Sequence, residues 1–347
     1  MATLRIVHTV NSVDPTQGGP SRTVPALCGH LAQERPDWRI QLVTSRAELA
    51  RVVAASPPDL IHDHGQWLPL NHSAARAARR TGVPRIVSPR GMLSPWSRRH
   101  RQWKKKLAWA LYAGRDMASA AVIHATSDLE MQELRELGVR QPIAVIPNGV
   151  DQPPLVAGGG ASEARPYVLF MSRVHEKKGV RELLEAWQSL DRGPWELVLA
   201  GPDEQGLMKR LSMPPGARYV GMVDGEAKTR LLAEASLFVL PSYSENFGVV
   251  VAEAMMAAVP VIATHGTPWK ILADEGCGWW IPMEQDRLAS TLKSAMAETA
   301  HALHSMGERG RAVAMAHFGW PRIASDMAAV YAWVLNGGSV PQCVDRR

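Results

Sequence analysis

The chain has 347 residues, 46% of them hydrophobic, which is enough for two domains of ordinary size, and no apolar run is long enough to span a membrane. Its three cysteines, Cys28, Cys277 and Cys343, lie far apart, which excludes a disulfide framework and favours a reducing compartment. Residues 1–150 contain 20 Lys and Arg against 11 Asp and Glu, within a chain of net charge +6, so the basic first half predicts an anionic partner.

The first half of the chain alternates short apolar runs with helical patterns. Strand patterns lie at 4–10, 40–44, 60–62, 85–88, 121–125 and 143–146, and helical patterns at 21–35, 71–81, 95–115 and 127–138. Continuous Val- and Ile-rich strands separated by helices are typical of a parallel sheet that is covered on both faces. We therefore predict an α/β domain over residues 1–150.

A run of breakers and glycines follows, and we predict a linker at 151–166. The pattern then restarts, with strand patterns at 167–172, 195–200, 219–220, 237–240 and 261–264. This repetition predicts a second α/β domain over 167–320. A last helix is predicted around 321–335, where apolar residues recur at near-helical spacing.

Two carboxylates lie on either side of a predicted helix start near Gly248. Glu245 follows a buried strand pattern, and Glu253 lies about one turn into an otherwise apolar helix, where a carboxylate needs a partner. Backbone N–H groups at a helix start attract anions. Phosphate-binding amides between two hydroxyl-binding carboxylates suit a nucleotide sugar. The alternative is a helix cap followed by a solvated helix residue.

Basic residues follow the first strand of the second predicted domain. Arg173 and Lys178 come at the carboxyl end of this strand, just before a helix, where they can bind a diphosphate. Taken alone, they also fit a solvated basic loop. No Asp-x-Asp constellation accompanies them, so we predict neither a metal nor a cofactor.

Three features of the first domain carry possible chemistry. Gly18 and Gly19 lie between the first strand and the first helix, where glycines allow close approach to a ligand. His124 ends a predicted strand, a position at which a single histidine is more often structural than catalytic. His62 and His64 share one face of a strand, which suggests a metal site. Third and fourth ligands are missing, so we reject the metal.

Together these motifs resemble retaining GT-B glycosyltransferases of family 4, the glycosyl transferases group 1. Glu245 and Glu253 match the E-x7-E signature of that family, and Arg173 with Lys178-Gly179 matches its R-x4-K-G element. The resemblance covers most of the chain and is strongest from 143 to 268. It implies two Rossmann-like parallel-sheet domains facing across a cleft, with the chain end, 321–347, packed back on the first domain.

The resemblance also implies a role for each motif. Glu245 would bind hydroxyls of the transferred sugar and Glu253 those of the ribose, in a UDP- or GDP-sugar. Transfer would retain the anomeric configuration by front-face attack. The implied catalytic residues are Glu245, His124, Arg173 and Lys178. The implied donor-binding residues are Glu253, Asn246, Phe247, Gly248, Gly18, Gly19 and Thr267. On the acceptor side the resemblance implies His62 and His64.

A basic, tryptophan-rich segment follows Pro95. Basic residues with interfacial aromatics are typical of attachment to an anionic leaflet. The alternative is a packed helix with a solvated basic face, and no recognised nucleic-acid module accompanies the segment. The predicted membrane-contact residues are Trp96, Arg98, Arg99, Trp103, Lys104 and Lys105.

Residues 88–96 look similar to transferases of bacterial polysaccharide assembly, which implies a saccharide acceptor. If the membrane contact holds, we expect this acceptor to be lipid-linked. The sequence enters its first strand pattern without a signal peptide, so we expect a cytoplasmic protein attached to the inner face of the plasma membrane. Rival functions are a sugar-nucleotide epimerase or a phosphorylase on the same architecture, and a non-catalytic two-domain sugar-binding protein.

Overall fold

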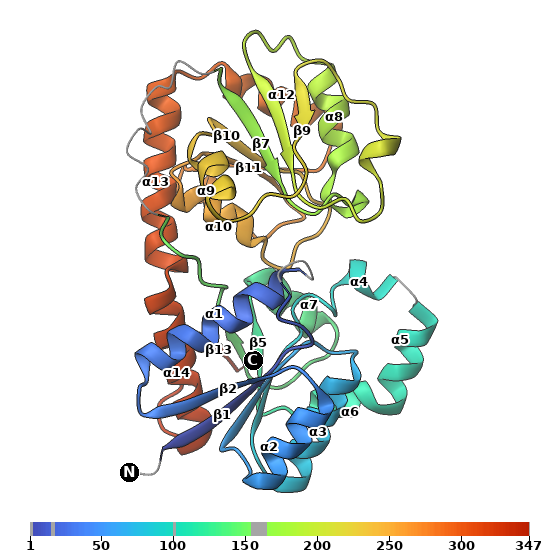
Figure 1. The fold of residues 1–347 in the computed structure, drawn as a ribbon, viewed down its shortest axis with the longest axis vertical. Coiled ribbons are helices and arrows are strands. Elements are labelled where there is room, and N and C mark those ends of the chain that lie inside the picture. Colours follow the sequence, from blue (N-terminus) through green and yellow to red (C-terminus); the bar gives the residue numbers. More distant parts are fainter. Residues whose placement is uncertain (1–2, 15–17, 100–101, 154–164, 347) are drawn as a thin grey trace. The chain divides into compact units, whose positions relative to one another are not determined.

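The computed structural model describes residues 3–14, 18–99, 102–153 and 165–346. The chain forms two compact units, one of residues 1–149 with 320–347 and one of residues 150–319 (Figure 1). Most of the predicted linker, namely 154–164, lies outside the described residues.

The first unit is built on a seven-stranded sheet in the order β13-β6-β5-β4-β3-β1-β2. All neighbouring strands are parallel except β13, which pairs with β6 in the antiparallel sense. Every residue of β3 and β4 is buried, as expected for central strands covered on both faces. The strands are β1 (Leu4–Thr9), β2 (Trp38–Val43), β3 (Leu60–His64), β4 (Arg85–Ser88), β5 (Val122–Ala125), β6 (Ile143–Val145) and β13 (Val344–Asp345).

Helices cover both faces of this sheet. Alternate strand residues such as Ile6 and Leu60 pack against α1 and α14, and their neighbours Val7 and Ile61 pack against α2 and α3. The helices outside the basic segment are α1 (Gly19–Glu34), α2 (Arg46–Ala55), α3 (Pro69–Thr81), α7 (Asp128–Glu136) and α14 (Trp320–Asn336).

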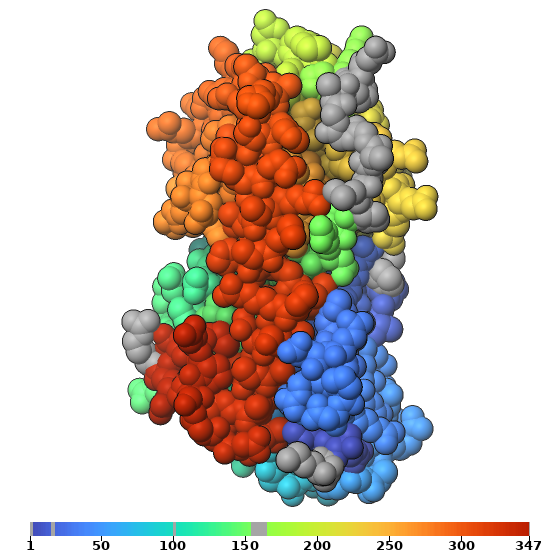
Figure 2. Space-filling model, turned by 90° about the vertical axis from the view of Figure 1, so that its left-hand side faces the viewer, coloured from blue at the N-terminus to red at the C-terminus, as the bar shows by residue number. Residues whose placement is uncertain are grey.

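The last helix belongs to the first unit. In α14, Ile323, Met327 and Tyr331 are buried in the same core cluster as Leu27 and Leu31 of α1. The two helices lie side by side on the surface of the unit, α14 in red and α1 in blue (Figure 2). The apolar spacing that predicted a helix at 321–335 therefore corresponds to a buried face.

The second unit is built on a six-stranded sheet in the order β12-β11-β10-β7-β8-β9, with all neighbouring strands parallel. Its strands are β7 (Tyr167–Met171), β8 (Glu196–Ala200), β9 (Ala217–Tyr219), β10 (Leu237–Leu240), β11 (Val261–Thr264) and β12 (Gly278–Ile281). Its helices are η3 (Glu176–Lys178), α8 (Val180–Gln188), η4 (Met208–Arg210), α9 (Gly225–Ala233), α10 (Val249–Met256), α11 (Ile271–Asp274), α12 (Gln285–Met296) and α13 (Ala300–Phe318).

Each sheet has a point where the strand order reverses. In the first unit the reversal lies between β1 and β3, and in the second it lies between β7 and β10. Ligands of open parallel sheets bind beside the carboxyl ends of the strands at such a switch point. We therefore expect ligand sites at the loops and strand ends of these two switch points.

The basic segment differs from its prediction as a single helix over 95–115. It contains α4 (Pro95–Arg99), α5 (Gln102–Ala108), the π-helical turn η2 (Trp109–Ala113) and α6 (Gly114–Ala118), and residues 100–101 lie outside the described part. The π turn adds a residue next to Trp109, whose ring packs on Trp67 with 6.1 Å between ring centroids. The inserted residue changes which side chains face outward after position 109.

Candidate functional site

The ends of β7 and β10 lie side by side at the switch point of the second unit, and each is followed by a predicted catalytic residue. Lys178 ends η3, and Glu245 lies in the loop after β10. The Lys178 ammonium donates to the Glu245 carboxylate in an ion pair whose two side chains are largely buried. The Ser242 hydroxyl donates to the same carboxylate oxygen at 2.8 Å. The structure therefore brings together two residues that the sequence placed in one site.

The Glu245 carboxyl is held in its ionised form. Burial raises the pKa of this carboxyl, but the charge of Lys178 and the hydrogen bonds from Lys178 and Ser242 lower the pKa below its ordinary value on balance. Both donors reach Oε1. A carboxylate has about four lone-pair sites, so Oε2 keeps the capacity to accept hydrogen bonds from sugar hydroxyls.

Glycines allow three loops to pack together around this ion pair. Gly179 has φ +67°, and a Cβ on it would lie 2.0 Å from the carbonyl oxygen of Pro241. A Cβ on Gly266 would lie 2.4 Å from the carbonyl oxygen of Tyr243. The Gly266 carbonyl accepts a hydrogen bond from the Glu245 N–H at 2.7 Å. Close backbone approach thus fixes where the Glu245 side chain begins.

The second carboxylate lies where the sequence predicted it. Gly248 is the N-cap of α10 with φ +79°, and Glu253 lies just beyond the first turn of that helix. Its partner is Lys228 of α9, whose ammonium donates to Glu253 at 2.6 Å. Both side chains of this pair are partly exposed. The required partner of a carboxylate in an apolar helix is therefore a lysine that the sequence analysis did not single out.

The other predicted donor-side residues differ in what their side chains do. Arg173 is exposed, with no hydrogen bond or ion pair to its side chain within the described residues. Asn246 is half-buried. Phe247 packs on Trp269 with 5.0 Å between ring centroids, and the Phe247 carbonyl accepts from Trp269 Nε1 at 2.5 Å. Thr267 is buried, and its hydroxyl donates to the Thr264 carbonyl at 2.7 Å. Phe247 and Thr267 thus hold loops in place.

Four histidines lie together near the carboxyl ends of strands in the first unit. His62 and His64 share one face of β3, with 4.0 Å between ring centroids, as predicted from their alternation. His8 of β1 and His124 of β5 come from other strands of the sheet, and Tyr331 of α14 reaches the same cluster. All five side chains are buried. The sequence analysis missed His8 and Tyr331, which are 323 residues apart.

The hydrogen bonds of this cluster form a chain with one direction. At one end, His124 Nε2 donates to the Ile146 carbonyl at 2.8 Å, because a carbonyl oxygen only accepts. The neutral ring then accepts at Nδ1 from His62 Nε2 at 3.3 Å. His62 Nδ1 accepts from the Tyr331 hydroxyl at 2.6 Å. Each donor assignment fixes the next tautomer along the chain.

The same logic continues to a guanidinium. The Tyr331 oxygen accepts from His8 Nε2 at 3.2 Å, and His8 Nδ1 accepts from His64 Nε2 at 3.1 Å. His64 Nδ1 accepts from Arg90 Nη2 at 3.1 Å. A guanidinium only donates, so both ends of the chain agree on one direction, and all four histidines are neutral Nε2–H tautomers. We call this series, from Arg90 to the Ile146 carbonyl, the histidine chain.

The electrostatics of the cluster agree with neutral rings. Burial, together with the charge of Arg90, lowers the pKa of His8 and of His124 to about 3. Burial also lowers the pKa of His62 and His64 well below the ordinary value. A proton added to any ring would place a second donor against a donor.

Three of these histidines lie close enough together to hold a metal ion. His8, His62 and His64 each offer a ring nitrogen within 4.8 Å of the others, so the premise that no third ligand exists was wrong. In the histidine chain, however, the Nδ1 lone pair of each of these rings already accepts a hydrogen bond. A metal ion would have to replace those bonds. The absence of a metal therefore stays a prediction.

Arg90 is a residue that the sequence analysis missed. It follows β4, is not glycine, and yet has φ +56°. Its guanidinium donates to Asn148 Oδ1 and to His64, and both of these partners are neutral. Burial lowers the Arg90 pKa to about 10, opposed by the charge of Glu130. The next peptide, Gly91 N–H, donates to the Glu130 carboxylate at 2.7 Å, which holds this turn.

The predicted glycine turn precedes α1. Gly18 is the N-cap of this helix with φ +106°, a conformation that favours glycine. A Cβ on Gly19 would meet no atom within 4 Å, so the space beside it is open within the first unit. Residues 15–17 lie outside the described part.

Two family models match the chain, one on each unit. The model described as Glycosyl transferase 4-like domain matches residues 5–149, and the model described as Glycosyl transferases group 1 matches residues 152–313. The chain belongs to the group 1 glycosyltransferases.

Known proteins resemble this glycosyltransferase along most of its length. Alpha-maltose-1-phosphate synthase of Mycobacterium tuberculosis is 26% identical over 338 residues, which covers 86% of each chain. The structure of sucrose-phosphate synthase from Thermosynechococcus elongatus matches with a TM-score of 0.76 at 19% identity, covering 96% of this chain and 100% of that one. The structure of HepE from Anabaena with UDP-glucose matches with a TM-score of 0.72 at 20% identity, covering 95% and 99%. The predicted GT-B fold is thus confirmed.

In this glycosyltransferase the basic segment is neither a fully packed helix nor a fully solvated one. Trp103, Leu107 and Leu111 are 69%, 53% and 71% exposed, so an apolar stripe faces outward. Trp96, Arg99 and Lys104 are exposed, and Arg98 and Lys105 are half-buried. Within the described residues, no helix is long and apolar enough to pass through a bilayer.

Proposed function

We propose that this glycosyltransferase moves a sugar from a nucleotide-sugar donor to a hydroxyl group of a saccharide acceptor, with retention of the anomeric configuration. The observation that carries the proposal is the buried ion pair of Lys178 and Glu245 at the switch point of the second unit. A ligand that brings both an anion and hydroxyl groups would offer each member of this pair a new partner, so neither charge would be left buried without one.

The donor diphosphate would take Lys178 as its partner. Arg173, exposed after the same strand, would add a second cation to the diphosphate. Glu245, released from Lys178, would accept hydrogen bonds from hydroxyls of the transferred sugar. The exchange leaves no buried charge without a partner, and this makes donor binding favourable.

Glu253 would bind the ribose of the donor. It lies just beyond the first turn of α10, and the start of this helix at Gly248 favours a phosphate. Lys228 is bound to Glu253 in the structure, and both are partly exposed, so ribose hydroxyls can replace the ammonium at little cost. HepE, which matches this fold, was crystallised with UDP-glucose, and this supports a donor of the same class.

In the transfer step, the bond from the anomeric carbon to the phosphate oxygen breaks, and a bond to the acceptor oxygen forms on the same face. The acceptor's proton passes to the leaving phosphate oxygen, so no protein carboxylate acts as the nucleophile. Lys178, Arg173 and the amides at the start of α10 would stabilise the charge that develops on the diphosphate. The placement of His124 at the donor sugar stays a prediction. Both of its ring nitrogens are hydrogen-bonded in the histidine chain, and this favours a positioning role.

We further propose a lipid-linked saccharide as the acceptor and attachment to an anionic membrane surface. The exposed stripe of Trp103, Leu107 and Leu111, next to several cations, supports this attachment. Flotation with vesicles of phosphatidylglycerol should carry the protein upward, and a Leu107→Ser/Leu111→Ser variant should float less. Wild-type protein that stays at the bottom of the gradient would remove membrane attachment from the proposal.

The donor assignment is tested by thermal shift with UDP- and GDP-sugars. A donor that binds only the folded protein raises the melting temperature, and Lys178→Ala should abolish this increase. Lys293→Ala, an exposed position on α12, is the matched control and should respond like wild type. If Lys178→Ala binds every active donor as wild type does, the proposed site is wrong. An epimer formed from donor without acceptor would favour the epimerase instead.

A further inference from the structure

A pocket with an unusual lining lies within the first unit, beside the basic segment. Its volume is about 380 Å³, in the range of small-molecule sites. Apolar groups of Trp67, Pro95, Trp109 and Leu137 form part of its wall. The remaining lining residues are Arg98, Arg99, Gln102, Lys105 and Lys106.

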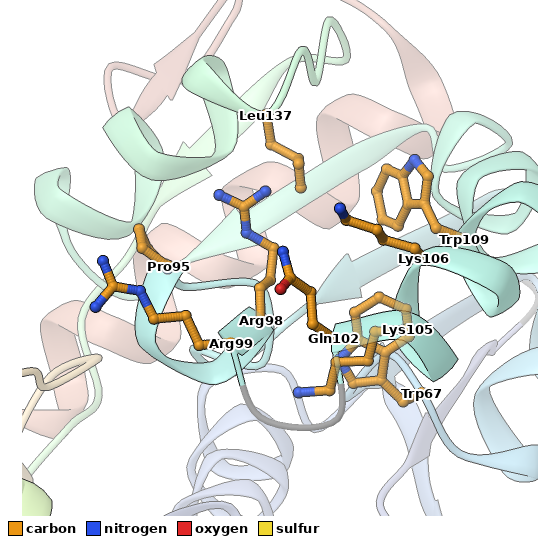
Figure 3. Close-up of a pocket in the computed structure, with 9 residues that line it drawn as sticks. All are labelled: Trp67, Pro95, Arg98, Arg99, Gln102, Lys105, Lys106, Trp109 and Leu137. Carbon is orange, nitrogen blue, oxygen red and sulfur yellow. The ribbon is translucent and has the colours of Figure 1, made fainter.

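The charge of this lining has one sign. Among its described residues four are cationic and none is acidic, so the pocket favours an anion. Figure 3 shows the Arg98 guanidinium directed toward Leu137 and the Lys106 ammonium directed toward the Arg98 side, with Trp109 beside Lys106. An anionic ligand in the pocket could contact both of these cations.

Arg98 carries a second, independent signal. Its Nε is buried and has no hydrogen-bond partner among the described residues. A buried donor without an acceptor costs free energy, and a ligand oxygen would satisfy it. Lys105 is already committed, since its ammonium donates to the Ser97 carbonyl and lies 5.7 Å from the ring centroid of Trp67. Figure 3 shows the Arg99 side chain extending away from Arg98 and Lys106, so these last two are the groups that can bind an anion.

The apolar part of the wall indicates what the anion is attached to. Trp67 and Trp109 offer ring surface, with 6.1 Å between their centroids, and Leu137 adds an aliphatic group. Inorganic phosphate would leave this surface wet. A ligand with a diphosphate at one end and a branched hydrocarbon at the other would use both parts of the pocket.

We propose that this pocket binds the diphosphate and the first isoprene units of a polyprenyl-linked acceptor. The proposal rests on the lipid-linked acceptor proposed above and gives that acceptor a binding site. Arg98 and Lys106 bind the diphosphate oxygens, and Trp67, Trp109 and Leu137 contact the hydrocarbon. All lining residues of this pocket belong to the first unit, whereas Lys178, Glu245 and Glu253 belong to the second.

Farnesyl diphosphate is a water-soluble probe of this chemistry, and its binding to the full chain can be measured by calorimetry. We expect farnesyl diphosphate to bind at least about tenfold more tightly than pyrophosphate or farnesol, because only it supplies both contacts. Arg98→Gln/Lys106→Gln should weaken its binding by about tenfold or more, and Leu137→Ala should weaken it without changing pyrophosphate binding. Equal binding of pyrophosphate, or no binding of farnesyl diphosphate, would overturn the proposal.

Two controls locate the binding. Arg76→Gln/Arg80→Gln removes the same charge from exposed positions on α3 and should bind farnesyl diphosphate like wild type. Lys178→Ala and saturating UDP should also leave this binding unchanged, because they act on the donor site. Competition by UDP would show that farnesyl diphosphate binds at the donor site, and this would contradict the inference. Failure of Lys178→Ala to lose donor binding would contradict the proposed function but not this pocket.

Discussion

Lys178 and Glu245 are 67 residues apart in sequence and form a buried ion pair between the ends of two adjacent strands. The pair exists because Gly179 lets the turn after β7 touch the carbonyl of Pro241 at the end of β10. Ser242 adds a hydrogen bond to the same carboxylate oxygen. In the proposed function, this lysine and this glutamate would separate, with Lys178 binding the diphosphate of the donor and Glu245 its sugar.

Glu245→Ala should reduce turnover by about a hundredfold or more while leaving the fold intact, because it would remove the proposed contacts to the reacting sugar. Transfer from the active donor, with circular dichroism as the check on folding, measures both effects. Glu298→Ala, an exposed position between α12 and α13, is the control and should keep full activity. Near-wild-type turnover of Glu245→Ala would refute its role.

Substitutions of Glu253 and of its partner Lys228 should affect donor binding differently. Glu253→Ala should weaken donor binding by about tenfold, the equivalent of one or two lost hydrogen bonds to ribose. Lys228→Ala removes the competitor for the same carboxylate, so donor binding should stay the same or become tighter. Titration calorimetry with the donor compares the two variants. Equal weakening by both would mean that the ion pair itself builds the site.

Gly179→Ala tests the close approach of the two strand ends. The new Cβ would lie 2.0 Å from a backbone carbonyl at φ +67°, so we expect a loss of roughly 3 kcal/mol or more in the free energy of unfolding. Gly276→Ala has a similar φ of +59° but meets nothing within 4 Å. It should cost only about 1 kcal/mol. Urea unfolding of both variants separates crowding from backbone strain, and equal losses would contradict the crowding.

The parts of the fold that could be predicted from the sequence are those that leave a local pattern of residues. The strands at 85–88, 237–240 and 261–264 were predicted with the bounds that the structure shows, because each contains consecutive apolar residues and is buried throughout. The start of α10 at Gly248 was also predicted, from a glycine before an apolar helix.

Signals that depend on packing were missed. Helix α2 has few buried residues and only a weak apolar face, and the edge strand β12 is half-buried throughout. Lys228 and Tyr331 had no local motif, since their roles follow from contacts to Glu253 and to two histidines far away in sequence. The sequence shows the Glu, Lys and His residues themselves, but it does not show which residues they contact in the fold.

Tyr331→Phe tests the hydroxyl that links two parts of the histidine chain. The change leaves the His8 Nε2–H without an acceptor and His62 Nδ1 without a donor, both in a buried site. Each unsatisfied group costs about 1–3 kcal/mol, so the unfolding free energy should fall by roughly 2–5 kcal/mol. Tyr243→Phe removes a hydroxyl that bonds Glu182 at 2.7 Å on the surface and should cost less than about 1 kcal/mol. Similar losses in the two variants would contradict the chain.

The histidine chain also predicts how stability depends on pH. His8 and His124 have an ordinary pKa of 6.5 when unfolded and about 3 when folded, so between these values the unfolded chain binds more protons. Stability is therefore fully present above about pH 6.5 and is lost as the pH falls. Each such histidine contributes a loss of about 2 kcal/mol between pH 7 and pH 5. Asp63 and Glu130, whose pKa values are raised by burial, oppose the loss in part.

Urea unfolding at pH 7, 6 and 5 measures this dependence, and we expect a steep fall in the unfolding free energy toward pH 5. Glu245 serves as an internal contrast, because its lowered pKa removes stability only when the pH falls through the carboxylate range, below about 4.5. A fall confined to that lower range would show that the buried histidines do not remain neutral on folding. A fall that begins near pH 6.5 requires groups that titrate as histidine when unfolded and stay uncharged in the fold, as the one-directional chain from Arg90 to Ile146 demands.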